Sequence, residues 1–245
     1  VVELCEVLPR FAALRTLDLS KNKIGLEGAK AIAEALMKSG TAVVITLYLG
    51  LNNIGDEGAI AIAEALKVNA VLLNELGLGN NSIGADGAKA IAEALKVNAV
   101  LTELRLGVNT IGDKGAKAIA EVLKVNAVVT TLSLWNNSIG DEGAIAIAEA
   151  LKIKAVLTTL HLNVNNIGDE GAIAIAEALK VNAVVTELWL GGNEIGDEGA
   201  KAIAEALKVN TVLTKLDLEY NSMGDAGKQA VRDAEKGRSG FRLEL

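Results

Sequence analysis

A 28-residue unit, repeated almost without change, constrains this chain more than any other feature. The copy at 185–212 reads VTELWLGGNEIGDEGAKAIAEALKVNTV. Leu188 and Leu190 are two positions apart, which predicts a strand with both side chains on one side. The second part places apolar residues at i, i+3, i+4 and i+7, the spacing of one helical face: Ala200, Ile203, Ala204 and Leu207. One strand and one short helix cannot bury these faces alone, so the units must stack on one another.

Charged residues mark both ends of the predicted helix. We expect Asp197 to be its N-cap, with the side chain bonded to the helix's own first turn. Glu198 adds negative charge to that turn and Lys208 adds positive charge at the other end, which complements the helix dipole. The same columns recur in most units, so this pattern indicates capping and solubility rather than an acid-specific function.

The leucine pair and an asparagine set the period of the chain. The first leucine recurs at 17, 47, 76, 104, 132, 160, 188 and 216, and a ninth pair is Leu243 with Leu245. An asparagine follows each of the eight, and its amide can bond backbone groups where the chain leaves the strand. On neighbouring units these amides are predicted to form a ladder: Asn22, Asn52, Asn81, Asn109, Asn137, Asn165, Asn193 and Asn221.

The pattern L-x-x-L-x-L-x-x-N, in its variant with valine first, resembles the leucine-rich repeat family, in the long-repeat subclass of ribonuclease inhibitor. The segment N-x-I-G-D-E-G-A-K-A-I-A-E-A-L is most similar to the repeat domains of NOD-like receptors. This resemblance implies an α/β solenoid shaped like a horseshoe, with parallel strands on the concave face and helices on the convex face. It also implies a protein partner bound on the concave face or its rim.

We expect residues 1–245 to form a single domain of about eight full repeats, with a partial N-terminal helix and a C-terminal capping strand. Val1 to Leu14 aligns with the second half of a unit, so the chain is expected to be part of a longer protein. Charged residues are enriched after Lys228, as the last unit of a stack requires. Leu243 to Leu245 is predicted to be the last edge strand.

Composition argues against several classes of function. The net charge of −7 disfavours a nucleic-acid partner, because phosphate binding needs a basic surface. No apolar run approaches the ~18 residues of a membrane-spanning helix. Cys5 is the only cysteine, so no disulfide framework exists, whereas secreted members of the family commonly have disulfide-bonded caps. We therefore expect a cytoplasmic protein with no membrane contact.

The sequence predicts no catalytic site, no metal site and no cofactor. His161 is the only histidine, so a histidine-rich metal site is excluded. The Gly-Asp-Glu-Gly turns lack the Lys-Ser/Thr of a phosphate-binding loop. Acidic pairs such as Asp141 and Glu142 recur at most helix starts, whereas a catalytic pair would be unique.

The units differ most at strand positions that point away from the core and in the turn that follows. Trp135, His161 and Trp189 fall on three consecutive strands about 4.7–4.9 Å apart, so their rings are expected to form one patch that Val164 extends. Large aromatic side chains dominate binding hot spots. We favour a partner-binding surface over aromatics tolerated on an unconstrained surface. The predicted concave-face contacts are Tyr48, Arg105, Trp135, His161, Asn163, Trp189 and Tyr220.

A second apolar set is predicted on the convex face. Ile60, Ile145 and Ile173 stand where other units have a lysine such as Lys89. We favour side chains that fold against neighbouring helices over a small oligomer contact, and we expect a monomer.

Three functional hypotheses follow. The leading one is the recognition or regulatory repeat domain of an intracellular NOD-like-receptor-type protein. The near identity of the units also fits a consensus-like or engineered scaffold with no native partner, although the spacings of 30 and 29 residues near the N-terminus argue against full design. The third is a GTPase-activating repeat protein, for which Arg105 is the conceivable arginine, but the acidic tail of that group is missing.

Overall fold

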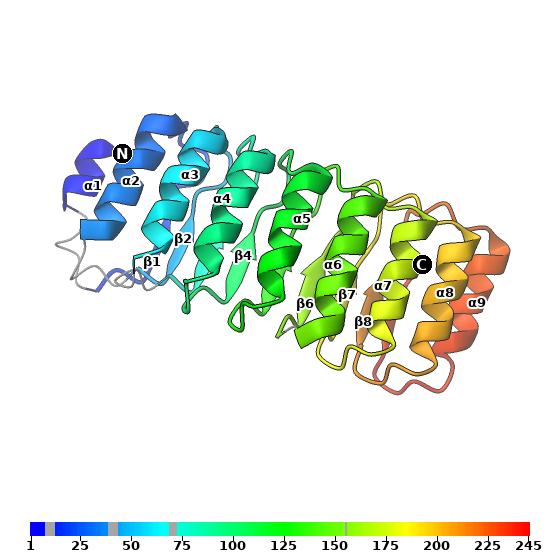
Figure 1. Cartoon of the computed structure of the whole chain (residues 1–245). Helices are drawn as coiled ribbons and strands as arrows, with labels where there is room; N and C mark the ends of the chain where they lie inside the picture. Colours follow the sequence, from blue (N-terminus) through cyan, green and yellow to red (C-terminus); the bar gives the residue numbers. More distant parts are fainter. Residues whose placement is uncertain (8–12, 39–43, 69–72, 155) are drawn as a thin grey trace.

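The computed structural model describes residues 1–7, 13–38, 44–68, 73–154 and 156–245 (Figure 1). Strands and helices alternate along the chain. The strands are β1 (Thr16–Asp18), β2 (Thr46–Tyr48), β3 (Glu75–Gly77), β4 (Glu103–Arg105), β5 (Thr131–Ser133), β6 (Thr159–His161), β7 (Glu187–Trp189), β8 (Lys215–Asp217) and β9 (Arg242–Glu244). The helices are α1 (Val2–Val7), α2 (Gly25–Lys38), α3 (Gly55–Leu66), α4 (Ala85–Leu95), α5 (Gly112–Leu123), α6 (Asp141–Lys154), α7 (Asp169–Leu179), α8 (Asp197–Leu207) and α9 (Asp225–Glu235).

The strands form one parallel sheet in which spatial order follows chain order from β1 to β9. The register aligns the same leucine in every repeat, so that Leu132 pairs with Leu160 and Leu160 with Leu188. Each helix brings the chain back to the end of the sheet at which the strands begin, so successive strands are parallel. The predicted last strand is present as β9, beside β8.

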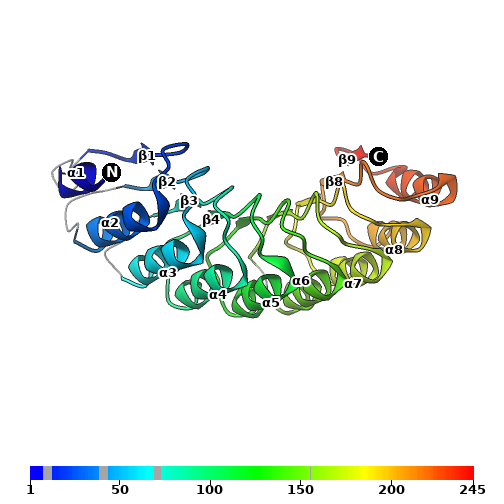
Figure 2. The ribbon, with the colours of Figure 1, turned by 90° about the horizontal axis from the view of Figure 1, so that it is seen from above.

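The two layers are curved into an arc (Figure 2). The strands line its inner side and the helices its outer side. The curvature has a simple cause, because packed helices need 8–10 Å between axes whereas paired strands need about 4.7–4.9 Å. The predicted α/β solenoid, with strands on the concave face and helices on the convex face, is confirmed.

The core lies between these layers. Leu188 and Leu190 are fully buried on the sheet side, and Ala200 and Ile203 are fully buried on the helix side. Alanine allows the helix to approach its neighbours closely, which explains a core built almost without aromatic residues. The convex Ile60, Ile145 and Ile173 remain 37–38 % exposed, so most of each side chain is covered.

The asparagines after the strands connect adjacent repeats. Asn165 Nδ2 donates to the carbonyls of Leu162 and Leu134 at 2.9 and 3.0 Å, and Asn165 Oδ1 accepts the amides of Asn137 and Ile139 at 2.9 and 3.0 Å. One side chain therefore bonds four backbone groups on two repeats. Six of the eight asparagines are buried, while the terminal Asn22 and Asn221 are not.

A second set of asparagines, which the sequence analysis did not single out, closes the other end of the helices. Asn98 Nδ2 donates 2.8 Å to the carbonyl of Leu66 at the end of the preceding helix, and its Oδ1 accepts the amides of Val100 and Leu101. The same bonds to the preceding helix are made by Asn126, Asn182 and Asn210. In the last repeat, Arg238 stands at this position and donates to three backbone carbonyls.

The expected N-cap role of the aspartates is wrong, because each one acts on the following helix. The N-cap of α8 is Gly196, and Asp197 is already a helical residue whose side chain makes no bond to its own first turn. Asp197 Oδ1 instead accepts the amides of Gly224 and Gly227, at the start of α9, at 2.8 and 2.9 Å. The same bond starts α4, α6, α7 and α8, from Asp56, Asp113, Asp141 and Asp169.

Two repeats lack this aspartate, and the helix that follows them starts differently. Leu26 and Ala85 occupy the position. The next helices, α3 and α5, begin at Gly55 and Gly112, whose φ angles of +67° and +57° lie in the left-handed region. Gly196, which is bonded to an aspartate, has an extended φ of −95°. Only glycine adopts the left-handed conformation without a steric cost.

Among the described residues, no helix combines the length and the apolar character needed to cross a membrane.

Candidate functional site

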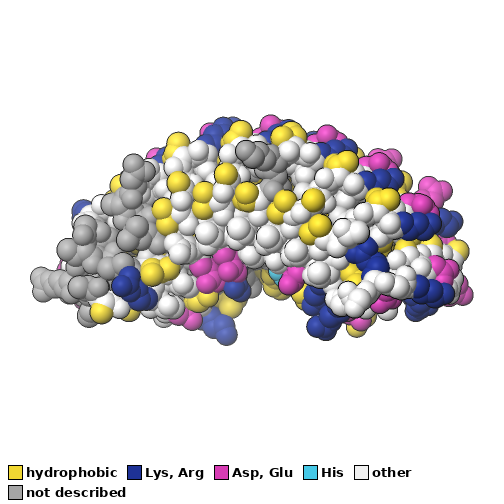
Figure 3. Space-filling model, turned by 90° about the horizontal axis from the view of Figure 1, so that it is seen from below, with side chains coloured by type: hydrophobic (Ala, Val, Ile, Leu, Met, Phe, Trp, Pro, Cys, Tyr) yellow, Lys and Arg dark blue, Asp and Glu magenta, His cyan; other side chains and the backbone are white. Residues whose placement is uncertain are grey.

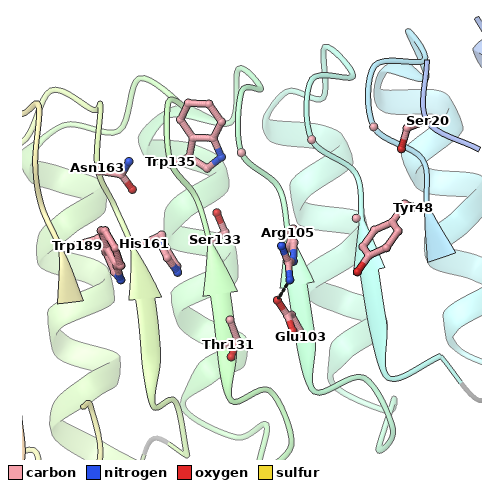
Figure 4. Close-up of a pocket in the computed structure, with 14 residues that line it drawn as sticks. Ser20, Tyr48, Glu103, Arg105, Thr131, Ser133, Trp135, His161, Asn163 and Trp189 are labelled. Atoms are coloured by element: carbon pink, nitrogen blue, oxygen red, sulfur yellow. Dashed lines mark ion pairs between the residues drawn. The ribbon is translucent and has the colours of Figure 1, made fainter. Parts of the chain in front are cut away.

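The concave face carries an open hollow of about 610 Å³ above β2 to β7 (Figure 4). Its lining comes from β2 to β7, the turns after them and Ser20 after β1, so one sheet positions every side chain. The N-terminal end of the hollow is lined by glycines, its centre by charged groups and its C-terminal end by larger side chains.

The glycine end owes its shape to missing side chains. Gly50, Gly77, Gly79 and Gly107 all line the hollow. A Cβ at Gly77 would lie 2.8 Å from Cδ1 of Tyr48, so only glycine lets the Tyr48 ring fold over the strand beside it. The space that a side chain at Gly77 would fill is therefore taken by the Tyr48 ring of the preceding repeat.

Arg105 is held in the centre by two carboxylates. Its Nη2 lies 2.9 Å from Oε1 of Glu75 and 2.6 Å from Oε1 of Glu103. The Tyr48 hydroxyl donates to the same Glu75 oxygen at 2.8 Å, and this bond is the main reason that the pKa of Tyr48 is raised. The Arg105 charge is thus already balanced, and its direction is fixed by the protein itself.

His161 and Trp189 form a stacked pair at the C-terminal end. Their ring centroids are 5.1 Å apart with an interplanar angle of 17°, and Lys215 Nζ lies 3.5 Å from the Trp189 ring centroid. Burial lowers the pKa of His161, so the ring is neutral near pH 7. Within the described chain, Trp189 Nε1 and Asn163 Oδ1 are buried without a hydrogen-bond partner.

Trp135 lies apart from this pair. Its indole covers Gly107 of the preceding repeat so closely that a Cβ there would be 1.9 Å from Nε1. Figure 4 shows the ring above β5, turned away from His161 and Trp189. The three rings therefore line one hollow as two separate groups, a stacked pair and a single indole that is 40 % exposed.

Tyr220 and Val164 lie outside the lining of this hollow. Tyr220 is 87 % exposed and borders a second, smaller hollow of about 360 Å³ at the C-terminal end, with Met223 and Leu245. Val164 is exposed in the turn after β6. Both residues have positive φ angles, of +54° at Tyr220 and +55° at Val164.

Three carboxylates approach one another beside β9, an arrangement that the sequence analysis missed. Asp217, Glu219 and Glu244 have oxygen atoms within 4.8 Å of one another. Burial raises the pKa of Asp217. Glu244 also pairs with Arg242 at 2.8 Å and with Lys215 at 3.6 Å, which balances part of this charge. Only the pairing of β8 with β9 reveals the cluster.

A repeated strand–helix unit in a single parallel sheet, with a hollow along its inner face, defines a solenoid repeat protein. The family described as Leucine Rich repeat matches residues 13–33, 44–63, 72–92, 97–120, 125–148, 155–176, 181–204 and 209–231. These segments cover more than half of the chain, and the chain belongs to the leucine-rich repeat family. Proteins of this family are generally binding scaffolds rather than enzymes.

Two solved structures illustrate the similarity. The actin-binding site 2 (ABS2) of leiomodin-1 is 30 % identical and has a TM-score of 0.51, covering 63 % of this chain and 87 % of its own. An internalin (inlF) from Listeria monocytogenes str. 4b F2365 is 20 % identical and has a TM-score of 0.61, covering 97 % of this chain and 56 % of its own. The internalin supports the fold alone. No curated protein sequence matches.

Proposed function

We propose that residues 1–245 act as one recognition domain that binds a protein partner in the concave hollow. The observation that carries this proposal is the exposed indole of Trp135 beside a hollow of about 610 Å³. A tryptophan at the edge of a concave surface supplies a large contact area at little conformational cost. The buried Asn ladder supports the proposal too, because it holds the strands in a fixed arrangement.

We propose different roles for the predicted contact residues, because their surroundings in the structure differ. Trp135 is the main anchor that we propose, because its outer surface is free. Trp189 and His161 stack on each other, and Arg105 is held by Glu75 and Glu103, so these residues shape the hollow. Asn163 offers an unused acceptor at the same end. Tyr48 closes the glycine end, and Tyr220 contacts only a partner that reaches beyond the hollow.

We further propose that the domain belongs to an intracellular protein of the NOD-like-receptor type, in the ribonuclease-inhibitor-like subclass. The repeated N-x-I-G-D-E-G-A segment supports this assignment. In this setting the chain is a non-enzymatic part of a longer, cytoplasmic protein. The competing hypothesis is a consensus-like scaffold with no native partner.

A pull-down with matched aromatic substitutions tests concave binding. We expect a protein captured by the parent chain to be lost with Trp135→Ala and retained with Tyr220→Ala, because Trp135 lines the hollow and Tyr220 does not. Circular dichroism checks that both variants are folded. Capture that Tyr220→Ala abolishes and Trp135→Ala does not would move the binding site away from the hollow. No capture by the parent chain would favour the scaffold hypothesis.

Actin is a second candidate, and it is a defined partner to test. The leiomodin-1 structure that resembles this chain is an actin-binding site. Purified actin can be titrated with the labelled chain, and Trp135→Ala again serves as the hollow variant. Binding that the substitution weakens tenfold or more would make actin the partner of the hollow. Absence of binding would leave the resemblance as one of fold.

A further inference from the structure

The centre of the concave hollow carries more negative than positive charge. Figure 3 shows acidic and basic side chains together at the hollowed side of the arc. Glu75 and Glu103 both pair with Arg105, and no other lysine or arginine of the described chain forms an ion pair with either glutamate. Two carboxylates and one guanidinium leave one negative charge in excess. The glutamate side chains are 18 % and 27 % exposed, so this charge is only partly hydrated. Since a partly buried charge without a counter-ion is costly, a cation that reaches it is favoured.

The groups around this ion pair do not supply the missing positive charge. Burial lowers the pKa of His161, and the charge of Arg105 lowers it further, so the imidazole is neutral near pH 7. Lys215 on β8 lies over the Trp189 ring and pairs with Glu244 at 3.6 Å. The excess negative charge is therefore left for a cation from outside the chain.

Two hydroxyl groups beside the ion pair have no hydrogen-bond partner in the part of the chain that the structure describes. Ser133 is only 8 % exposed, yet it lines the hollow with this unused hydroxyl. Thr131 lines the hollow in the same way, two residues earlier on β5. The register places Thr131 beside Glu103 and Ser133 beside Arg105, and Figure 4 shows both between that pair and His161. A buried polar side chain with no partner beside a hollow indicates a ligand group there.

We propose that the protein partner of the hollow places a basic side chain, from lysine or arginine, against Glu103, where the hydroxyls of Thr131 and Ser133 accept its other N–H groups. This inference rests on the proposed concave binding and adds the chemistry of the partner. An ammonium or a guanidinium has several N–H donors and no acceptor, which suits a site of carboxylate and hydroxyl oxygens. The same partner segment can place an apolar side chain on Trp135, which lines the same hollow.

An acidic group of a partner fits this site less well. The remaining N–H groups of Arg105 can bond a carboxylate, but that carboxylate would also approach Glu75 and Glu103, whose oxygens lie 2.9 and 2.6 Å from the same guanidinium. Like charges this close oppose binding. The net charge of −7 acts in the same direction at longer range, because it attracts basic partners and repels acidic ones.

Peptide selection tests the charge preference and separates it from concave binding itself. A phage-displayed library of short random peptides is selected on the parent chain, and the binders are tested against Trp135→Ala. We expect binders that depend on Trp135 and that are enriched in lysine and arginine over aspartate and glutamate. Binders that depend on Trp135 without this enrichment would overturn the inference and leave concave binding supported. The absence of any binder that depends on Trp135 would count against both.

Two substitutions in the site should change the affinity for a selected basic peptide in opposite directions. Glu103→Gln removes the excess negative charge, and we expect it to weaken binding about tenfold. Arg105→Gln removes the opposing positive charge, and we expect it to strengthen binding. Fluorescence anisotropy of the labelled peptide measures both affinities, and circular dichroism checks the fold. A purely structural disturbance would weaken binding in both variants, and that result would contradict the proposal.

Glu198→Gln is the matched control for the charge of the whole chain. It changes the net charge by the same amount as Glu103→Gln, but Glu198 is exposed in the first turn of α8 and forms no ion pair with a described residue. We expect the basic peptide to bind this variant as it binds the parent chain. A loss equal to that of Glu103→Gln would assign the preference to the overall charge and not to the hollow, and would overturn the proposal.

Discussion

The two halves of the solenoid build the same repeat in different ways. In the N-terminal half (residues 16–123), three of the four helices start at a glycine in the left-handed region: Gly25, Gly55 and Gly112. In the C-terminal half (residues 131–235), the glycine amide at every helix start donates a hydrogen bond to an aspartate of the repeat before it. The concave surface divides in the same way, with glycines over β2 to β4 and larger side chains over β5 to β7.

This difference shows that a single side chain can decide the backbone conformation of the next repeat. The two helix starts differ in φ by about half a turn, yet the strands, the register and the buried leucines are the same in both halves. The repeat tolerates either solution because the hydrophobic core, and not the turn, specifies the fold.

Core truncations should have the largest effect and should be equal in the two halves. Leu49 and Leu134 occupy equivalent positions and are fully buried. Changing either to alanine should cost about 2–5 kcal/mol of stability, because it leaves a cavity between the layers. Urea denaturation followed by circular dichroism measures both. A loss below ~1 kcal/mol at Leu134 would show that this leucine is not core, and a loss confined to one half would break the equivalence.

Removing one inter-repeat cap should cost less, about 1–2 kcal/mol. Asp141 Oδ1 accepts the amides of Gly168 and Gly171 at 2.8 Å, and both lose this partner in Asp141→Ala. Asp86 is the control, since it lies one position later in its repeat and is exposed. Asp86→Ala should change the denaturation midpoint little. Equal effects of the two changes would mean that the cap does not stabilise the C-terminal half.

A third substitution tests the glycines of the two halves. Gly112→Ala should cost about 1 kcal/mol, because alanine must adopt a left-handed conformation. Gly140→Ala should be nearly neutral, since its added Cβ makes an ordinary 3.4 Å contact with Asp113. Adding Ala85→Asp should restore the missing cap and reduce the cost of Gly112→Ala. Thermal melts of the single and double variants measure this coupling, and additive losses would refute it.

The smallest expected effect is a pH dependence of stability. It comes from His161, which lies in the C-terminal half. Burial lowers the pKa of this histidine in the folded chain below its ordinary value of about 6.5. The unfolded chain then binds the proton more readily, so stability falls as the pH decreases through about 6.5 and levels off below the folded-state pKa. Melting temperatures between pH 8 and pH 5 should fall more for the parent than for His161→Gln. Parallel curves would show that the burial of His161 has no consequence for stability.

The features that the sequence predicted most directly are those that a single repeat contains. The leucine pair and the helical stripe depend on spacing within 28 residues, and both are buried as their periods indicate. The hydrogen-bond partners of the Asp197 side chain could not be predicted in this way, because Gly224 and Gly227 belong to the next repeat.

The concave site shows the same limit. Its position in the variable columns was visible in the sequence, but the direction of Trp135 depends on Gly107 of another repeat. The stacking of His161 on Trp189 follows from their strand register, whereas the separation of Trp135 from that pair does not. A contact between repeats joins different positions of two neighbouring repeats, whereas a column of aligned residues compares the same position in every repeat.

The bond from each aspartate to the next helix also means that the 28-residue unit is not self-contained as a part for recombination. A unit that is duplicated or grafted supplies a glycine amide that donates to the unit before it and a carboxylate that accepts from the unit after it. A unit that is deleted removes both groups. Insertions among the units with Asp113, Asp141 and Asp169 leave every junction matched. The unit with Ala85 has no carboxylate to accept the amide at the next helix start. A unit inserted directly after it must therefore have glycine at its own helix start.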